Sequence, residues 1–442
     1  MANFIQKSIK RVAIIGGGPG GIAAARALRD EGNFDTITIF ERNNHTGGTW
    51  HYSPETNHPP PFPSTNALQV DTTLHMGKLH SPIYANLHTN LPHPVMCFQD
   101  VSFPKDTPYF PSHVNVMNYL DQLAKNENLL PWIRFSTLVE NAVFENDVWN
   151  ISVNNNGKAY TEKFDAVVVA TGHYAVPYVP DFLGLDKLAQ NEKVQLLHSR
   201  DYRQPEDFKG KTILVIGGGS SAIDIVRETS AVAIKVYQCI RTETELSRQA
   251  LERYPPNVHQ VSLIKSFNDS NSSFSVDLQD NSTLTDVDVV VFGTGYLYSF
   301  PFLPFQKDNL IKTGQKVHNL NQYLFYRNNP TLAFLGLPIR VVPLPLMQRQ
   351  SIVMARYWSG KIPMYPFLES EEEGDGDNRL EFIMGVAKEF DYDERLGAWA
   401  EGWVESDREG WQSDHPLTGR LSEQWKDLRK NALSLRREYL GY

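Results

Sequence analysis

The sequence contains very little cysteine. Its 442 residues include only two, Cys97 and Cys239, which lie far apart and form no CxxC pair. Metal tetrads and redox dithiols need closely spaced thiols, so we predict no metal site and no disulfide redox centre. Isolated thiols of this kind are typical of packing residues in a protein from a reducing compartment.

The sequence also lacks an excess of basic residues and any long apolar run. Its 42 Lys and Arg residues are outnumbered by 51 Asp and Glu residues, which gives a net charge of −9. General binders of nucleic acid need a basic face, so we expect a small-molecule partner and no nucleic acid. No uncharged apolar run approaches the roughly 20 residues that span a bilayer, and the first residues do not resemble a secretory signal. We therefore expect a cytoplasmic protein without integral membrane association.

What the sequence does contain is one pattern of elements that is used twice. In the first half, an apolar strand at 12–15, an alanine-rich helix at 22–28 and a second strand at 36–41 form a βαβ unit. Residues 146–164 alternate like two strands on either side of an Asn-Gly turn, and 165–172 reads as another buried strand. This order predicts an α/β domain.

The second half repeats the same order. A strand at 212–216, a helix from Ser221, a strand at 234–240, a hairpin at 274–284 and a strand at 288–295 follow one another. The two halves therefore predict two Rossmann-like domains with one common plan.

Proline-rich segments at 174–180 and 298–305 bracket the second unit, as is usual for linkers between domains. We therefore predict an α/β fold of two Rossmann-like dinucleotide-binding domains, with the second domain inserted into the first. The predicted segments are 1–175 and 298–442 for the first domain, the latter with C-terminal helices, and 176–297 for the inserted domain.

A helical apolar stripe runs through the C-terminal residues, among many Lys and Arg side chains. It consists of Trp425, Leu428, Ala432, Leu435 and Tyr439. A stripe at this spacing is typical of a helix that packs on a core, and contact with a membrane surface is the alternative. We expect core packing.

A glycine-rich turn joins the first strand to the first helix. Gly16, Gly18 and Gly21 have the spacing GxGxxG, which permits a tight turn, close approach of a pyrophosphate and close helix packing. Glu41 ends the next strand 20 residues after Gly21, where a carboxylate accepts hydrogen bonds from a ribose. The predicted dinucleotide-binding residues here are Gly16, Gly17, Gly18, Pro19, Gly20, Gly21, Glu41 and Arg42.

A second glycine turn opens the inserted unit. Gly217 and Gly219 keep the spacing, and Ala222 takes the place of the third glycine. The next strand ends in Arg241 instead of an acid, and a guanidinium pairs well with a ribose 2′-phosphate, here with the Thr242 hydroxyl assisting. This favours NADP(H) over NAD(H), and a plain surface arginine is the alternative. The two turns together predict one flavin and one nicotinamide dinucleotide.

Four further stretches resemble segments of a known family. FGTGYLYSFPF at 292–302 resembles the FxTGYxxxxPF signature of the flavin-containing monooxygenases. ERNNHTGGTW at 41–50 resembles their FAD segment, and IYANLHTNLPHPVMCFQD at 83–100 resembles their flavin-facing loop. HSRDY at 198–202 resembles the end of their identifying motif. The resemblance covers most of the chain and is to the soluble fungal and bacterial members.

The identifying motif FxGxxxHxxxY is present only in part. His198 and Tyr202 match it, but Glu192 and Val194 stand where Phe and Gly are expected. Tyr202 in place of Trp favours the heteroatom oxygenases of the family over the related Baeyer–Villiger enzymes. The alternative for His198 and Tyr202 is packing of a loop between the two domains.

The resemblance implies that the first domain binds FAD and the inserted domain NADPH. Asn90 matches an asparagine that the family places beside the isoalloxazine, although by itself it is an ordinary turn residue before Leu-Pro. The other residues implied to contact FAD are Gly48, Thr49, Trp50, Thr89, Val139 and Thr171. The residues implied to sit at the pyrophosphate turn of NADPH are Ser220, Ser221 and Asp224.

The implied activity is an NADPH- and O₂-dependent monooxygenase of the N,N-dimethylaniline type. NADPH would reduce FAD, O₂ would form a C4a-hydroperoxide on it, and a soft nucleophilic nitrogen or sulfur centre of a small molecule would take the distal oxygen. Asn90 would position groups rather than act as acid or base. The alternatives are an NADPH oxidase that releases H₂O₂, a Baeyer–Villiger-type monooxygenase and a non-catalytic FAD/NADPH redox sensor. A homodimer is one possible oligomeric state of the protein.

The assignment of Arg241 leads to a test with two cofactors. We expect Arg241→Ala to lose about 1.5 to 3 kcal/mol of NADPH affinity, the scale of a charge-assisted hydrogen bond, or about tenfold to a hundredfold in Kd. NADH has no 2′-phosphate, so its use is expected to change little. Equal losses for NADPH and NADH in binding titrations would refute the assignment.

Overall fold

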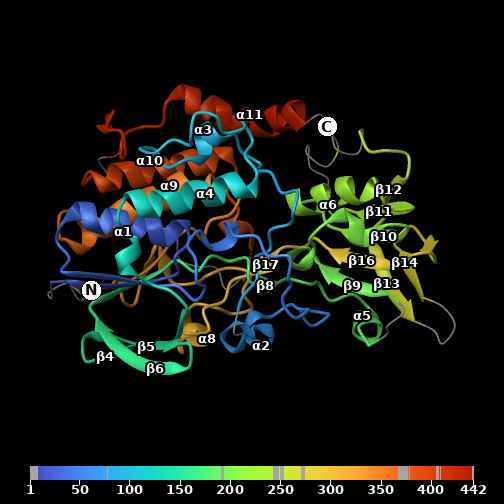
Figure 1. The fold of residues 1–442 in the computed structure, drawn as a ribbon, viewed down its shortest axis with the longest axis horizontal. Helices are drawn as coiled ribbons and strands as arrows, with labels where there is room; N and C mark the ends of the chain where they lie inside the picture. The colour runs from blue at the N-terminus through green and yellow to red at the C-terminus, as the bar shows by residue number, and fades with distance from the viewer. Residues whose placement is uncertain are drawn as a thin grey trace.

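A computed structural model describes the fold in two α/β units that lie side by side (Figure 1). The larger unit carries the N-terminus and most of the helices, and the smaller unit is built around its own parallel sheet. The described residues are 8–76, 78–190, 194–241, 248, 253–269, 274–366, 377, 379–404, 408 and 410–440.

The sheet of the larger unit has seven strands, with β1 between β2 and β7 in parallel pairing. The central strands are buried on both faces, which explains their continuous apolar runs. In sheet order the strands are β18 (Leu320–Asn321), β19 (Phe325–Tyr326), β20 (Leu332–Phe334), β7 (Ala166–Val169), β1 (Arg11–Ile15), β2 (Thr36–Phe40) and β3 (Ile133–Arg134).

Helices stack in layers on one face of this sheet (Figure 1). Helix α1 (Pro19–Glu31) packs against α9 (Pro343–Trp358), and α9 packs against α10 (Val386–Ala400). Small buried residues of α1 permit this close approach of two helices. Helix α4 (His113–Asn126) and helix α11 (Glu423–Leu440) complete the helical layer.

An antiparallel sheet lies on the opposite side of the larger unit (Figure 1). It consists of β4 (Thr137–Glu145), β5 (Val148–Asn155) and β6 (Lys158–Phe164). Asn156 and Gly157 join β5 to β6 with positive φ angles of 48° and 90°, which suit the tight turn of a hairpin. The hairpin predicted for 146–164 is confirmed.

The smaller unit has a five-stranded sheet in which every pairing is parallel. Helix α6 (Ser220–Ser230) connects β10 to β11, as in a Rossmann unit. In sheet order the strands are β12 (Val258–Val261), β11 (Lys235–Cys239), β10 (Thr212–Ile216), β16 (Val289–Phe292) and β9 (Gln195–His198). A separate antiparallel ribbon consists of β13 (Ile264–Asp269), β14 (Phe274–Leu278) and β15 (Thr283–Leu284).

The chain enters and leaves the smaller unit through two adjacent strands. β8 (Val176–Pro177) pairs antiparallel with β17 (Tyr296–Leu297). In the sequence, the smaller unit is therefore inserted between the strands of the larger sheet that precede it and those that follow it. The predicted fold, with one Rossmann-like domain inserted into another, is confirmed. The domain boundaries at 175 and 297 stay predictions.

The C-terminal stripe packs on the larger unit along part of its length, and Tyr439 near its end remains 49% exposed. The Trp425 ring lies 6.1 Å from that of Phe390, and the Tyr439 ring lies 5.5 Å from that of Phe110. Ala432 is completely buried. Figure 1 shows α11 running along the larger unit toward the smaller one.

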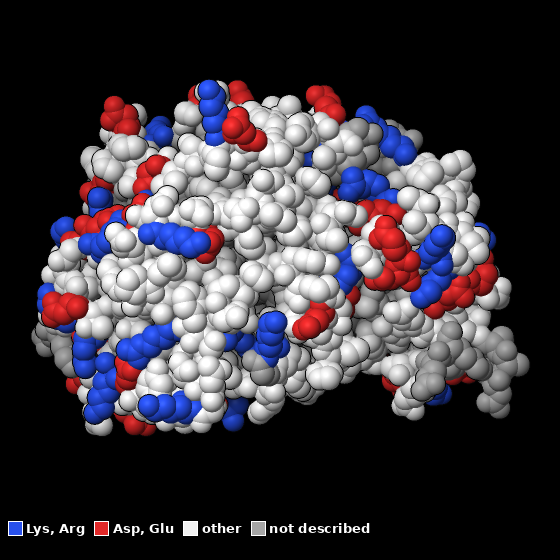
Figure 2. Space-filling model, viewed as in Figure 1, with Lys and Arg blue, Asp and Glu red and all other residues white. Residues whose placement is uncertain are grey.

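The remaining helices are short and lie in connecting segments. No helix of the described ranges has the length and apolarity needed to cross a membrane. Figure 2 shows charges of both signs interspersed around one face, with a mainly uncharged centre. The short helices are α2 (Ala67–Val70), α3 (His93–Met96), α5 (Leu185–Leu188), α8 (Gln306–Asn309), η1 (Gly48–Trp50), η2 (Thr73–His75), η3 (Leu130–Trp132), η4 (Ser199–Asp201), η5 (Pro205–Phe208) and η7 (Arg379–Phe382).

Candidate active site

A cavity of about 2070 Å³ is lined by both units. The carboxyl ends of β1 and β10 open into it, which is where α/β sheets bind ligands. The predicted site residues that line it are Gly16, Gly18, Pro19, Gly20, Glu41, Arg42, Gly48, Thr49, Trp50, Thr89, Asn90, Val139, Thr171, Gly217, Gly219, Ser220, Ser221 and Arg241. Gly17, Gly21 and Asp224 are not among the lining residues, and Thr242 lies outside the described residues.

The first glycine turn depends on very close backbone contacts. A Cβ atom at Gly21 would lie 2.0 Å from the carbonyl oxygen of Gly16, and one at Gly16 would lie 2.5 Å from the carbonyl oxygen of Ala170. Gly18 caps α1 without a side-chain hydrogen bond to the first turn, so backbone amides remain for a ligand at the cavity. These features fit the pyrophosphate of a dinucleotide.

Glu41 is held at the end of β2 by backbone amides. It is 5% exposed, and its Oε2 and Oε1 accept hydrogen bonds from the amides of Gly17 and Asn43, each at 2.7 Å. Burial raises the pKa of Glu41, and the two hydrogen bonds act against this rise. Each oxygen has a further acceptor position, which fits the role of a ribose ligand. Gly17 therefore contacts Glu41 and is not among the residues that line the cavity.

The second glycine turn has the same design. Gly217 has a φ of 140°, and a Cβ there would lie 2.4 Å from the carbonyl oxygen of Gly293. Gly219 caps α6 without a side-chain hydrogen bond, and a Cβ at Gly219 would meet nothing within 4 Å. Arg241 is exposed just beyond the end of β11 and lines the cavity. The turn and the arginine fit a second dinucleotide with a 2′-phosphate.

Besides the loop of Thr89 and Asn90, three segments of the larger unit supply the residues expected along the flavin. The η1 turn packs directly on the first glycine turn, since a Cβ at Gly48 would lie 2.9 Å from the Cα atom of Gly18. Val139 on β4 is buried, and Thr171 is exposed after β7. The first glycine turn and these segments therefore line one continuous cavity.

The loop that carries Asn90 is tightly held on both sides of this residue. The Thr89 amide donates to the carbonyl oxygen of Pro111 at 2.9 Å, and the Thr89 hydroxyl donates to the carbonyl oxygen of Leu91 at 2.8 Å. Thr89 is buried, whereas Asn90 is exposed and lines the cavity. The loop thus presents the Asn90 side chain from a fixed backbone.

Asp224 is placed differently from the other predicted NADPH residues. It is buried on the side of α6 that faces the larger unit, where the Tyr84 hydroxyl donates to it at 2.6 Å and Arg436 pairs with it at 3.0 Å. Tyr84 and Arg436 had no role in the sequence analysis.

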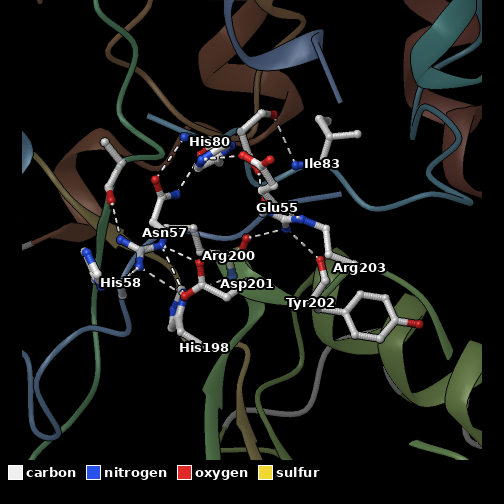
Figure 3. Close-up of polar contacts among 12 residues, drawn as sticks. Glu55, Asn57, His58, His80, Ile83, His198, Arg200, Asp201, Tyr202 and Arg203 are labelled. Carbon is white, nitrogen blue, oxygen red and sulfur yellow. Dashed lines mark hydrogen bonds and ion pairs between the residues drawn. The ribbon is translucent and has the colours of Figure 1, made fainter. Parts of the chain in front are cut away.

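The HSRDY segment joins the two units through its arginine, as Figure 3 shows. Arg200 donates to the carbonyl oxygen of His58 at 2.6 Å and to the carboxylate of Asp201 at 3.0 Å. His198 is completely buried, and its Nδ1 accepts from the amide of Arg200 at 3.1 Å. Tyr202 is also buried, and its hydroxyl donates to Glu228 on α6 at 2.8 Å. The structure favours the packing alternative for His198 and Tyr202.

Arg203 extends the same contact (Figure 3). Its guanidinium donates to the carbonyl oxygens of Glu55 at 2.9 Å and Ser81 at 3.0 Å. Backbone carbonyls as acceptors leave no sequence pattern, so this contact had no signal in the sequence. Arg200 and Arg203 together tie the segments at 55–58 and 81 to the start of the smaller unit.

The chain matches two families of known proteins. The family described as flavin-binding monooxygenase-like matches residues 69–275 and 262–363. The family described as NAD(P)-binding Rossmann-like domain matches residues 14–75, which contain the first glycine turn and Glu41.

Individual relatives agree with these matches. The thiol-specific monooxygenase of Saccharomyces cerevisiae is 33% identical over 382 residues, covering 83% of this chain and 81% of the relative. The flavin-containing monooxygenase FMO GS-OX-like 4 of Arabidopsis thaliana is 35% identical over 371 residues, covering 80% and 77%. The structure of S-allyl-L-cysteine S-oxygenase from Allium sativum superposes with a TM-score of 0.78 at 30% identity, covering 97% and 93%.

The close contact at Gly21 predicts a loss of bound flavin. Gly21→Ala would place a Cβ 2.0 Å from the Gly16 carbonyl oxygen, so we expect the purified variant to retain far less FAD per chain than wild type. Gly219→Ala is the matched control, because its Cβ meets no atom within 4 Å and it lies in the other turn. We measure FAD from the ratio of flavin to protein absorbance. A Gly21→Ala protein with the wild-type FAD content would contradict the assignment.

The buried His198 predicts a loss of stability in acid. Burial, followed by the charge of Arg200, lowers the pKa of His198 to about 3, whereas an unfolded histidine titrates near 6.5. The unfolded chain therefore takes up a proton that the folded chain rejects, and the free energy of unfolding falls as the pH drops below about 6.5. At pH 4.5 this amounts to about 2 to 3 kcal/mol.

Urea unfolding at pH 7.5 and 4.5 isolates this contribution. In His198→Asn, whose amide oxygen also accepts from a backbone amide, we expect the acid loss to be about 2 to 3 kcal/mol smaller than in wild type. His259→Asn, which changes an exposed histidine of the same unit, should keep the wild-type loss. Equal losses in wild type and His198→Asn would show that His198 is not buried in its neutral form.

Proposed function

Because the chain belongs to the flavin-binding monooxygenase-like family, we propose that it transfers one oxygen atom of O₂ to a soft nucleophilic sulfur or nitrogen centre of a small molecule. It is a flavin-dependent monooxygenase, and its cofactors are FAD and NADPH. The observation that carries the proposal is that both glycine turns and Asn90 line one cavity. Two dinucleotides bound there would share the space in front of Asn90.

In this proposal, the residues next to β1 would hold FAD. The uncapped first turn of α1 would receive its pyrophosphate, and Glu41 would accept hydrogen bonds from its ribose. When bound, FAD supplies the redox chemistry and the activation of oxygen. The chain itself orients the ring and excludes water, with Trp50, Thr89 and Thr171 along the same stretch of lining.

The smaller unit would hold NADPH. The first turn of α6, with Ser220 and Ser221, would receive its pyrophosphate, and Arg241 would pair with its 2′-phosphate. Asn90 lines the same cavity from the larger unit, where it would contact the nicotinamide of a dinucleotide held by this turn. The Asn90 amide can donate to one ring system and accept from the other, and so orients both. No side chain has to act as a general acid or base in this scheme.

Sulfur is the first substrate centre to test. The Saccharomyces cerevisiae relative is named for thiols, and the Allium sativum protein is an S-oxygenase of S-allyl-L-cysteine. We therefore expect thiols or thioethers to stimulate NADPH oxidation and to gain one oxygen atom in product mass, with tertiary amines as the comparison class. If neither class yields an oxygenated product, the proposed function is wrong.

An NADPH oxidase that releases H₂O₂ is the main alternative, and the ratio of O₂ consumed to product formed separates the two. A Baeyer–Villiger-type enzyme would give esters from ketones in the same panel, and a redox sensor would not turn over NADPH. A disulfide reductase would need a redox pair of cysteines, and Cys239 lines the cavity while Cys97 is not among its lining residues.

The two free thiols also support a cytoplasmic location.

The position of Asn90 predicts that its loss uncouples NADPH oxidation from oxygenation and does not abolish NADPH oxidation. Hydride transfer from NADPH does not need the amide, so anaerobic flavin reduction in Asn90→Ala should stay within about tenfold of wild type, or about 1.4 kcal/mol. H₂O₂ should replace oxygenated product, because the two rings would lose the side chain that orients them. Stopped-flow absorbance and peroxide assays give the two readouts.

Asn86→Ala provides the matched control for this experiment. Asn86 lies in the same loop but is not among the residues that line the cavity. It should remain coupled. If Asn90→Ala forms product as efficiently as Asn86→Ala, Asn90 is only a turn residue.

A further inference from the structure

A buried ion pair joins the C-terminal helix to the smaller unit. Arg436 on α11 and Asp224 on α6 are 6% and 2% exposed, and Nη2 of Arg436 lies 3.0 Å from Oδ2 of Asp224. The hydroxyl of Tyr84 donates to the same oxygen at 2.6 Å. Two segments of the larger unit therefore hold one carboxylate of the smaller unit.

The same guanidinium also holds the loop that carries Asn90. Nε of Arg436 donates to the carbonyl oxygen of Thr89 at 3.1 Å, and its Nη2 donates to the carbonyl oxygen of His88 at 3.5 Å. The Thr89 carbonyl belongs to the peptide bond that continues into Asn90. Because a peptide unit is planar, a hydrogen bond to its oxygen also restrains the backbone nitrogen of Asn90.

Helix α11 is itself anchored to the larger unit before it reaches Arg436. Arg429 pairs with Glu389 at 2.8 Å and donates to the carbonyl oxygen of Arg340 at 3.1 Å. Arg429 and Leu433 also line the cavity. The helix thus borders the active site and presents Arg436 from a fixed position.

Stability alone is a weak explanation for this arrangement. The desolvation of two buried charges commonly offsets most of their attraction, so a buried pair need not stabilise a fold. The guanidinium is a rigid plane with five N–H donors, and here it serves a carboxylate of one unit and two carbonyl oxygens of the other. A shift of α6 relative to the loop would break one of these two sets of contacts.

We propose that Arg436 is a positioning residue that holds Asn90 in register with the NADPH-binding unit. This inference rests on the proposed function, because the register matters only if Asn90 orients both cofactors. Arg436 acts through the Thr89–Asn90 peptide and through Asp224. The C-terminal helix, which is remote from the glycine turns in sequence, therefore sets how well NADPH oxidation is coupled to oxygenation.

The test compares three variants with wild type as FAD-loaded proteins. Arg436→Met keeps the bulk of the side chain and removes its hydrogen bonds. Tyr84→Phe weakens the hold on Asp224 without touching Thr89, and Arg437→Met changes the neighbouring arginine of α11. The readouts are the share of NADPH recovered as H₂O₂, the change in flavin absorbance when NADP⁺ binds the oxidised enzyme, and the melting temperature.

We expect Arg436→Met to raise the H₂O₂ share about fivefold or more, the effect of losing one hydrogen bond of about 1 kcal/mol. We also expect NADP⁺ to perturb its flavin absorbance less than in wild type. Tyr84→Phe should lower the melting temperature with at most a twofold rise in H₂O₂, and Arg437→Met should match wild type. If Arg436→Met does not fold, Arg436→Lys replaces it, with a smaller rise in H₂O₂ expected.

A folded Arg436→Met or Arg436→Lys protein with wild-type coupling and wild-type flavin perturbation would overturn the inference. So would Tyr84→Phe if it uncouples as strongly, since uncoupling would then follow stability alone. If wild type itself yields only H₂O₂ with every substrate, the proposed function fails. The NADP⁺-induced absorbance change does not depend on oxygenation, and it then decides the inference by itself.

Discussion

In both glycine turns, two backbone segments approach each other so closely that no side chain fits between them. A Cβ at Gly21 would lie 2.0 Å from the carbonyl oxygen of Gly16, and one at Gly217 would lie 2.4 Å from that of Gly293. This closeness brings the uncapped first turns of α1 and α6 to the ends of their strands, where both open on one cavity. The loops that line the rest of the cavity are arranged around these two turns.

The relative position of the two units depends on buried polar contacts. Arg200 and Arg203 of the smaller unit bind backbone carbonyls of the larger unit, and Arg436 of the larger unit binds Asp224 of the smaller one. Hydrogen bonds are directional, whereas apolar burial is not, so these contacts fix an orientation that apolar packing leaves free. In the proposed function the two cofactors are held by different units, so a site shared by both needs such a fixed orientation.

The fold could be predicted because its signals are local. A few consecutive residues are enough to predict each of these features: the glycine turns, the Asn156–Gly157 hairpin and the proline-rich joints. The contacts between the units could not be predicted in this way, because the contacting residues are far apart in the sequence. Arg436 and Thr89, for example, are separated by 347 positions. Arg436 follows the buried Ala432 by four residues and so shares its helix face, but an arginine there suggests a solvated surface. Whether the Asp224 side chain points to the cavity or to the larger unit likewise depends on which face of α6 packs against the larger unit.

We propose that both cofactors meet inside one cavity of one chain. Anaerobic bleaching of the flavin absorbance by NADPH tests it most directly, with NADPH deuterated at the nicotinamide C4 as the comparison and enzyme concentration as the variable. We expect bleaching whose rate constant at saturating NADPH is independent of enzyme concentration and is lower with the deuterated cofactor. Absent bleaching, or a rate constant that rises in proportion to enzyme concentration, would contradict it.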